Sequence, residues 1–383
     1  MLKNYFKNKN YIALYLNSIG NNIAGALFSF FSGTYLYSMG MPLHFVILFF
    51  GLEFGLRGVL SPLGPIFSRK FGIPTTMLIS YISLSVFFFI ISLASTSLFI
   101  SFFSFIFISF AWGIECPIMN FIYSMVVDNK HRGKQFSLNI VIGAISRMFG
   151  IFIGAMLIDK VNFVWIAVFA TIISLLTSIP FFIFLDDIHI PKISFIDPYK
   201  FLFSKEFREN LIPMTGYSLS IIANESIAPL FIFILVGSFK IFGFIFILSI
   251  LAEKIFTLLF GHYIDKNGNK KSVILSSILL SIGLFTYMFI YNPLSAFLVS
   301  SYTQISKNMF FGSLETGLHK KMKNSKHSFI YSTAKEMSLC FSEVIYLPIF
   351  ALIAYFFDKN IFAIVFLSGI FGLYLVRKFF RYS

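Results

Sequence analysis

Long apolar runs alternate with short polar connectors along almost the whole chain. Most runs exceed the ~20 apolar residues that a helix needs to cross the hydrocarbon of a bilayer. Short connectors such as Asn292-Pro293 require neighbouring helices to be antiparallel. The pattern predicts an all-α polytopic membrane protein with 12 transmembrane helices, at residues 11–37, 43–66, 75–94, 98–127, 135–158, 162–185, 209–237, 241–264, 272–291, 294–319, 328–357 and 360–380.

One longer polar segment, residues 187–208, divides the apolar runs into two sets of six. It is rich in prolines and basic residues, which is typical of a loop at the membrane surface. We therefore expect a cytoplasmic linker between an N-terminal six-helix bundle (1–186) and a C-terminal six-helix bundle (209–383).

The two sets of runs repeat one another. Asn21-Asn22 in the first run corresponds to Asn224-Glu225 in the seventh, and Asp159 corresponds to Asp358 at the start of the sixth and twelfth runs. Both correspondences have an offset of about 200 residues, which is the behaviour of an internal duplication. The shared offset predicts two pseudo-symmetric bundles.

Composition and charge restrict the class of protein and its location. Hydrophobic residues make up 57% of the chain and charged residues 12%, whereas an ordinary soluble domain has roughly 25% charged residues. If the N-terminus is inside, most Lys and Arg residues fall on cytoplasmic connectors, as the positive-inside rule requires. We expect cytoplasmic N- and C-termini, the cell membrane as location, the lipid bilayer as surroundings, a monomer and no nucleic-acid partner.

The connector after the eighth run has the sequence Gly261-His-Tyr-Ile-Asp-Lys-Asn-Gly-Asn-Lys-Lys271. Gly268 is expected to reverse the chain, and Asp265 places a carboxylate where a helix N-terminus or a cation can meet it. This pattern resembles the signature loop of the major facilitator superfamily of secondary transporters, which recurs between helices 2 and 3 and between helices 8 and 9. The resemblance implies a gating role for Gly261, Asp265, Lys266, Gly268, Lys270 and Lys271.

A degenerate copy of this loop follows the second run. Ser68 stands where the pattern has its acid, while both glycines and the basic pair are present. The resemblance extends the gating role to Gly64, Arg69, Lys70 and Gly72. Only the second loop can supply a carboxylate, so the two loops are expected to be unequal.

Charged residues within the predicted spans are the candidates for function. Each costs roughly 2.5–3.5 kcal/mol at the centre of a span, so such residues usually face a cavity or a partner. Away from their ends, the third, sixth, ninth and twelfth runs contain none (Arg377 and Lys378 lie in the last turn of the twelfth), which predicts that these helices face lipid and the others enclose a polar passage. The charged residues are Glu53, Arg57, Glu115, Arg147, Glu225, Glu253, Lys254, Lys307, Glu315, Lys335, Glu336 and Glu343.

Local spacing separates these residues into groups. Glu53 and Arg57 lie four residues apart, so they are expected either to neutralise each other within one helix or to act separately. Glu253, Lys254, Lys335 and Glu336 lie toward span ends, which favours a structural or gating role. The deeper side chains are predicted either to line a substrate or ion cavity or to form pairs between helices; together with two amides on the first and seventh runs they are Asn21, Glu115, Arg147, Asn224, Glu225, Lys307, Glu315 and Glu343.

Glu225 is the strongest candidate for a coupling-proton site. It lies at the duplicated Asn position, and Pro229 one turn later interrupts helical hydrogen bonding, as in the broken helices of other transporters. A carboxylate removed from water binds a proton more readily than one in solution. The expected activity is therefore secondary transport of a small solute by alternating access, coupled to protons.

Other functions are open at this stage. Gly113 is preceded by Ser109 where drug/proton antiporters of this superfamily usually have Arg, so an efflux antiporter is not favoured. The alternatives are a membrane-embedded lipid- or isoprenoid-handling protein or enzyme, and a transporter-like receptor without flux. The sequence has no phosphate-binding loop, and Asp186-Asp187 lacks the second aspartate pair that magnesium-diphosphate chemistry needs, so no enzyme, cofactor or metal site is predicted.

Overall fold

The protein is described here by a computed structural model of residues 9–126, 132–158, 160, 161, 163–186, 188 and 190–380; within these ranges, the side chains of residues 126, 132–138, 140 and 257–269 are not described. No strand is assigned in the described residues. Of the predicted signature-loop residues, Gly261, Asp265, Lys266 and Gly268 fall in the segment without described side chains.

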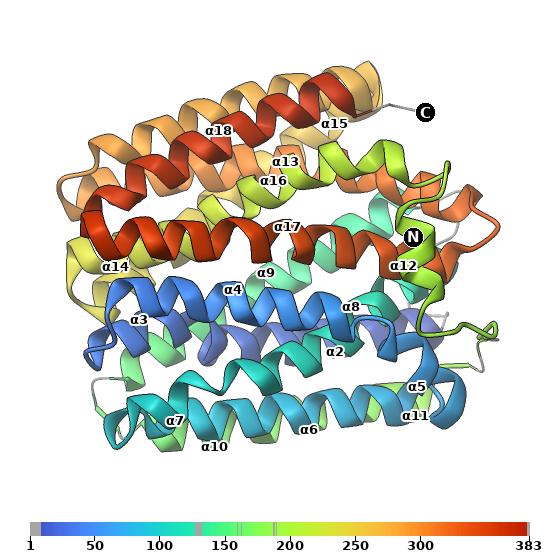
Figure 1. Cartoon of the computed structure of the whole chain (residues 1–383), viewed down its shortest axis with the longest axis horizontal. Helices are drawn as coiled ribbons and strands as arrows, with labels where there is room; N and C mark the ends of the chain where they lie inside the picture. The colour runs from blue at the N-terminus through green and yellow to red at the C-terminus, as the bar shows by residue number, and fades with distance from the viewer. Residues whose placement is uncertain are drawn as a thin grey trace. The chain divides into compact units, whose positions relative to one another are not determined.

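The helices before the linker follow the predicted spans and break several of them into shorter pieces (Figure 1). The break before α11 has a clear cause: Pro180 has no N–H and lies in the first turn, where none is needed. The elements are α2 (Lys9–Leu27), α3 (Ser32–Ser38), α4 (Leu43–Leu60), α5 (Leu63–Phe71), α6 (Ile73–Ser92), α7 (Leu98–Phe102), α8 (Phe105–Val126), α9 (Arg132–Leu157), α10 (Phe163–Leu176) and α11 (Ile179–Phe184).

The remaining helices include the longest elements of the chain. The linker itself contains one short helix, α12 (Asp197–Leu202). Then follow α13 (Leu211–Ile221), a π-helical turn (Ile222–Ile227), α14 (Ala228–Val236), α15 (Phe239–Thr286), α16 (Pro293–Asn324), α17 (Ser328–Phe357) and α18 (Ile361–Phe379). Seven segments of the described residues are long and apolar enough to cross a membrane, so the count of twelve stays a prediction.

The predicted reversal at Gly268 is not found as a break in secondary structure. The backbone is helical from Phe239 to Thr286 without interruption, across both predicted spans and their connector. A single glycine costs only about 1 kcal/mol relative to alanine inside a helix, and the apolar runs on both sides favour helix. The residues from Lys270 to Phe289 qualify separately as a candidate membrane span.

Contacts group the chain into two compact units. One comprises residues 1–32, 56–200 and 327–336, and the other comprises 33–55, 201–326 and 337–383. Each contains buried aromatic side chains, such as Phe28 in the first and Phe242 in the second. The predicted domain boundaries at 186 and 209 stay a prediction.

Glycines allow close helix crossings inside each unit. In the first, α9 packs on α2, and a Cβ added to Gly150 would lie 2.6 Å from the carbonyl oxygen of Ile23. In the second, α13 packs on α18 through Gly216 and Gly372, where either added Cβ would collide with the backbone of the other. Small residues that let backbones approach are the usual solution for helix packing in membranes.

Gly150→Ala is expected to destabilise the protein by about 1–3 kcal/mol, the usual cost of overpacking. The added methyl group meets the backbone of α2, which cannot move aside without shifting the whole helix. The measurement is the thermal midpoint of the purified protein in detergent. Gly25→Ala on α2 is the matched control, because an added Cβ there has no neighbour within 4 Å; equal midpoints for the two variants would contradict the prediction.

Candidate functional site

A buried carboxylate in the first unit is held by neutral donors from two other helices. Glu115 on α8 is 4% exposed, and its Oε1 accepts a 2.6 Å hydrogen bond from Asn21 on α2 and a 3.3 Å bond from the Tyr81 hydroxyl on α6. Asn17 on α2 donates to the same hydroxyl. The structure thus brings Asn21 and Glu115 together, two of the predicted cavity residues.

Tyr81 was not anticipated from the sequence, because its run has no charged residue and was expected to face lipid. Its side chain is fully buried, although Ile82 and Phe89 on the same helix are exposed. Helix α6 therefore presents one apolar face outward and one polar group inward. A tyrosine hydroxyl carries no charge, so a search for charged residues could not find it.

Arg147 lies on the exposed part of α9. Its guanidinium is 3.5 Å from the Oδ1 of Asn22 on α2, at the limit of hydrogen-bond distance. Arg147 and Asn22 therefore form a weaker polar contact. Asn22 is adjacent on α2 to Asn21, the donor to Glu115. The predicted cavity role of Arg147 stays a prediction.

The second unit contains an ion pair at the irregular turn between α13 and α14. Glu225 lies in the π-helical turn between α13 and α14, and its Oε1 is 2.7 Å from the Nζ of Lys307 on α16. Pro229 has no N–H to bond to the carbonyl of Glu225, four residues earlier, which favours the irregular turn. π-turns of this kind occur frequently at functional sites.

Exposure differs between the partners of this pair. The Lys307 side chain is 10% exposed and that of Glu225 is 41% exposed. The neighbouring Asn224 is buried and donates to the carbonyl of Ser220, 2.8 Å away on its own helix. The Asn224 amide is therefore bonded within its own helical segment. The Glu225 carboxylate instead contacts α16 and is partly exposed.

A second carboxylate of this unit, Glu315 on α16, also has partners. Glu315 accepts a 3.1 Å hydrogen bond from the hydroxyl of Tyr217 on α13, and its other oxygen is 3.6 Å from His319, one turn later. The predicted run 294–319 ends at His319, whereas α16 continues to Asn324 and keeps this residue on the helix. In each unit a carboxylate thus accepts hydrogen bonds from earlier helices: Glu115 from α2 and α6, and Glu315 from α13.

Glu53 on α4 and Glu343 on α17 are both buried, at 3% and 2% exposed. Burial of a carboxylate is expensive unless it has partners. Both carboxylates therefore lie in the interior of the protein. The predicted pairing of Glu53 with Arg57 and the predicted cavity role of Glu343 stay predictions.

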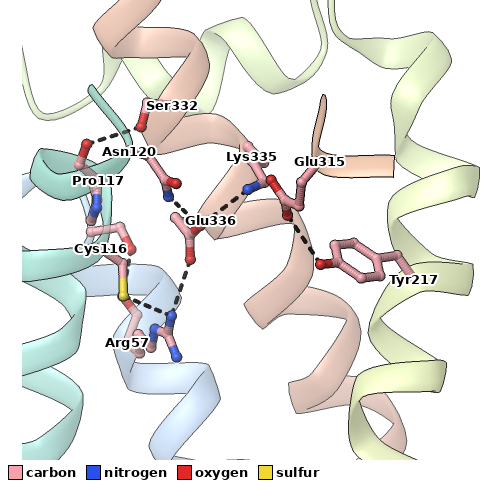
Figure 2. A network of polar contacts seen from close by, with 10 residues as sticks. Arg57, Cys116, Pro117, Asn120, Tyr217, Glu315, Ser332, Lys335 and Glu336 are labelled. Atoms are coloured by element: carbon pink, nitrogen blue, oxygen red, sulfur yellow. Dashed lines mark hydrogen bonds and ion pairs between the residues drawn. The ribbon is translucent and has the colours of Figure 1, made fainter. Parts of the chain in front are cut away.

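Arg57 on α4 is the centre of a polar network in the first unit (Figure 2). Its Nη2 is 3.1 Å from the Oε2 of Glu336 on α17 and 3.0 Å from the Sγ of Cys116 on α8. The second oxygen of Glu336 accepts from Asn120, at 2.8 Å. Glu336 and the adjacent Lys335 are buried, and their predicted structural or gating role stays a prediction.

Three uncharged residues of α8 that surround Arg57 or Glu336 were not predicted from the sequence. Cys116 and Asn120 lie one turn apart on α8, and Trp112 on the same face holds its ring 5.5 Å from the Arg57 guanidinium. None is charged, and their partners are far away in the sequence. Only a search for polar side chains repeated at helical spacing would have indicated them.

The first signature-like segment forms α5 and its end. A Cβ at Gly64 would lie 2.8 Å from the carbonyl oxygen of Ile114, and Gly72 ends the helix with a φ of 81°, which favours glycine. Arg69 and Lys70 are exposed, whereas Ser68 is buried. In the second segment, Lys270 and Lys271 are exposed. Exposed basic residues suit contact with anionic headgroups.

Tyr81→Phe is expected to destabilise the first unit by about 1–3 kcal/mol, because Glu115 and Asn17 each lose a buried partner. The ring stays, so packing is unchanged. The measurement is again the thermal midpoint in detergent. Tyr291→Phe makes the same chemical change at a side chain that is 79% exposed and is expected to leave the midpoint unchanged; an equal response from both would refute the network.

Within the described residues, no group of three or more His, Cys, Asp or Glu side chains is placed to hold a metal ion. The polar groups instead form pairs and clusters between helices.

Comparison with known proteins now identifies the family. Among solved structures, the chain resembles the human organic anion transporter MFSD10 (TETRAN), with 14% identity, TM-score 0.70 and coverage of 96% of this chain and 99% of that one. It also resembles a variant of the nucleoside transporter NupG, with 14% identity, TM-score 0.71 and coverage of 97% and 100%. At this identity the likeness shows the fold alone.

Curated protein sequences give no match. The model of the Major Facilitator Superfamily, however, matches residues 11–302. Because this match spans well over half of the 383 residues, the chain belongs to the major facilitator superfamily.

Proposed function

We propose that the protein is a secondary transporter that moves a small solute across the membrane by alternating access, coupled to protons at Glu225. The observation that carries the proposal is the 2.7 Å ion pair between Glu225 and Lys307 at the π-helical turn. Family membership supports membrane transport, and the paired charges supply a place for coupling.

The pair can exchange its ligands. While Glu225 is ionised, it holds the ammonium group of Lys307. When Glu225 binds a proton, the Coulomb attraction is lost, and Lys307 becomes available to a negatively charged group. A proton and an anionic solute would therefore bind together, and each would leave when the pair forms again.

This exchange favours an anionic or zwitterionic solute. One structural neighbour is described as an organic anion transporter and the other as a nucleoside transporter. We therefore propose an organic anion as the first substrate class to test, with a nucleoside as the neutral comparison.

Flux in proteoliposomes tests the proposal. The purified protein is reconstituted with fluorescein as the organic anion or radiolabelled uridine as the nucleoside, with and without an imposed pH gradient. We expect the pH gradient to increase the flux of one probe in proteoliposomes, and this flux to exceed that in protein-free liposomes. A pH-sensitive dye trapped inside should report a change in internal pH that accompanies the flux. Flux that is independent of the gradient would contradict proton coupling, and no flux of any probe in a wider solute panel would contradict transport.

We further propose that the protein acts as a monomer in the cell membrane, with both termini in the cytoplasm. The exposed basic residues Arg69, Lys70, Lys270 and Lys271 support this orientation under the positive-inside rule. Protease protection of a C-terminal tag in sealed, right-side-out vesicles tests the orientation: the tag is expected to be cut only after the membrane is opened.

A further inference from the structure

A groove on the surface of the second unit is unrelated to the charged residues described above. It has a volume of about 520 Å³ and lies between the last part of α15 and α18. This volume falls within the ~300–1,000 Å³ of typical small-molecule sites. The two helices pack against each other (Figure 1), so the groove follows the seam between them.

The walls of the groove are apolar and open to the outside. Ile278, Ile282 and Phe285 line it from α15 and are between 41% and 49% exposed. The hydroxyl of Ser281, also in the wall, donates to the carbonyl of Ser277 on its own helix, at 2.8 Å. The walls therefore present apolar surface, and the Ser281 hydroxyl is already bonded to its own helix. Such walls suit a hydrocarbon chain.

One end of the groove is basic and aromatic. Arg377 lines it, with its guanidinium carbon 5.7 Å from the ring of Tyr374, and the adjacent Lys378 places its Nζ 5.7 Å from the same ring. Tyrosines and basic residues gather where a bilayer meets water. This end thus has the chemistry of the headgroup region, and the rest has that of the acyl-chain region.

The length of the groove fits one leaflet. Its lining on α15 extends from Ser277 to Phe285, which corresponds to about 12 Å along the axis at 1.5 Å per residue. Half of a ~30 Å hydrocarbon core is ~15 Å deep. An acyl chain that enters at Arg377 would therefore follow the groove through most of the leaflet.

We propose that this groove binds an anionic glycerophospholipid, with the phosphate at Arg377 and one acyl chain along Ile278, Ile282 and Phe285. Basic pockets between transmembrane helices are known to hold anionic lipid headgroups. The charge at one end and the apolar wall beyond it match the two parts of such a lipid. The assignment is independent of the transported solute.

Native mass spectrometry of the purified full-length protein tests the assignment. The protein is incubated with equal amounts of phosphatidylglycerol and phosphatidylcholine that carry the same acyl chains, and the lipids retained are compared. We expect the wild type to retain phosphatidylglycerol preferentially. Arg377→Gln is expected to reduce its retention about five-fold, the effect of one basic residue near an anionic surface. Lys200→Gln, at an exposed basic residue of the other unit, is the matched control and is expected to change nothing.

Two further arms separate the lipid from other ligands. Ser281→Phe fills the groove with a ring and is expected to reduce retention of both lipids, while the protein keeps its elution volume. Soluble glycerol phosphate, the headgroup without chains, is expected not to displace retained lipid. The proposal is overturned if the wild type retains the two lipids equally, if Arg377→Gln and Lys200→Gln behave alike, or if glycerol phosphate releases the bound lipid.

Discussion

Glu225→Gln is expected to abolish the dependence of transport on the pH gradient and to lower the thermal midpoint of the protein. The amide cannot bind a proton or balance the charge of Lys307, whose side chain is only 10% exposed. Removing one partner of a buried pair costs about 3–5 kcal/mol, and the cost here should fall below that range because Glu225 is 41% exposed. Proteoliposome flux and thermal unfolding in detergent measure the two effects.

Stability and coupling are expected to separate in combined variants. Glu225→Gln together with Lys307→Gln removes both charges, so the thermal midpoint should return toward that of the wild type while proton coupling stays lost. Glu206→Gln neutralises an exposed carboxylate of the same unit and is the matched control. If Glu225→Gln transported with a full response to pH, Glu225 would not be the coupling site.

Arg57→Ala is expected to produce the second large effect, a fall in stability of the first unit. Glu336 would lose its guanidinium partner at 3.1 Å while both side chains are mostly buried. The cost should approach the lower end of ~3–5 kcal/mol, because Asn120 and Lys335 still contact the carboxylate. Thermal unfolding in detergent is the measurement.

The geometry at Arg57 makes lysine an incomplete substitute. One Nη atom contacts both Glu336 and Cys116, and the guanidinium carbon lies over the Trp112 ring. A lysine provides a single point charge. The expected order of midpoints is wild type, then Arg57→Lys, then Arg57→Ala. Arg69→Gln removes an exposed arginine on α5 as a control, and a loss there as large as at Arg57 would show that the network does not matter.

Hydropathy predicted the bounds of a helix correctly where polar residues flank that helix. The run at 328–357 coincides with α17, Ser328–Phe357, because charged or polar residues flank an apolar stretch. The run at 11–37 instead divides near Phe28 into α2 and α3. Apolar aromatic residues at that break give no hydropathy signal, so backbone irregularity inside an apolar run stayed hidden.

The candidate site was only partly predictable, because charge identifies a residue but not its partner. Glu225 and Lys307 were both indicated as deep charges, yet 82 residues separate them, and only the packing of α16 beside the π-turn brings them together. Neutral partners such as Tyr81 and Tyr217 carry no charge and resemble ordinary apolar residues in sequence. Their hydroxyl groups become visible only when burial leaves them beside a carboxylate.

The π-helical turn at Ile222–Ile227 has a consequence for the evolution of the chain. A π-turn accommodates one residue more than an α-helical path, and each residue advances an α-helix by about 100°. Deleting Ile222 would therefore rotate α13 by about 100° about the axis relative to Glu225 and α14. The single extra residue thus sets which face of α13 lies toward α16, and a homologue without it should not combine the Tyr217–Glu315 contact with the Glu225–Lys307 pair.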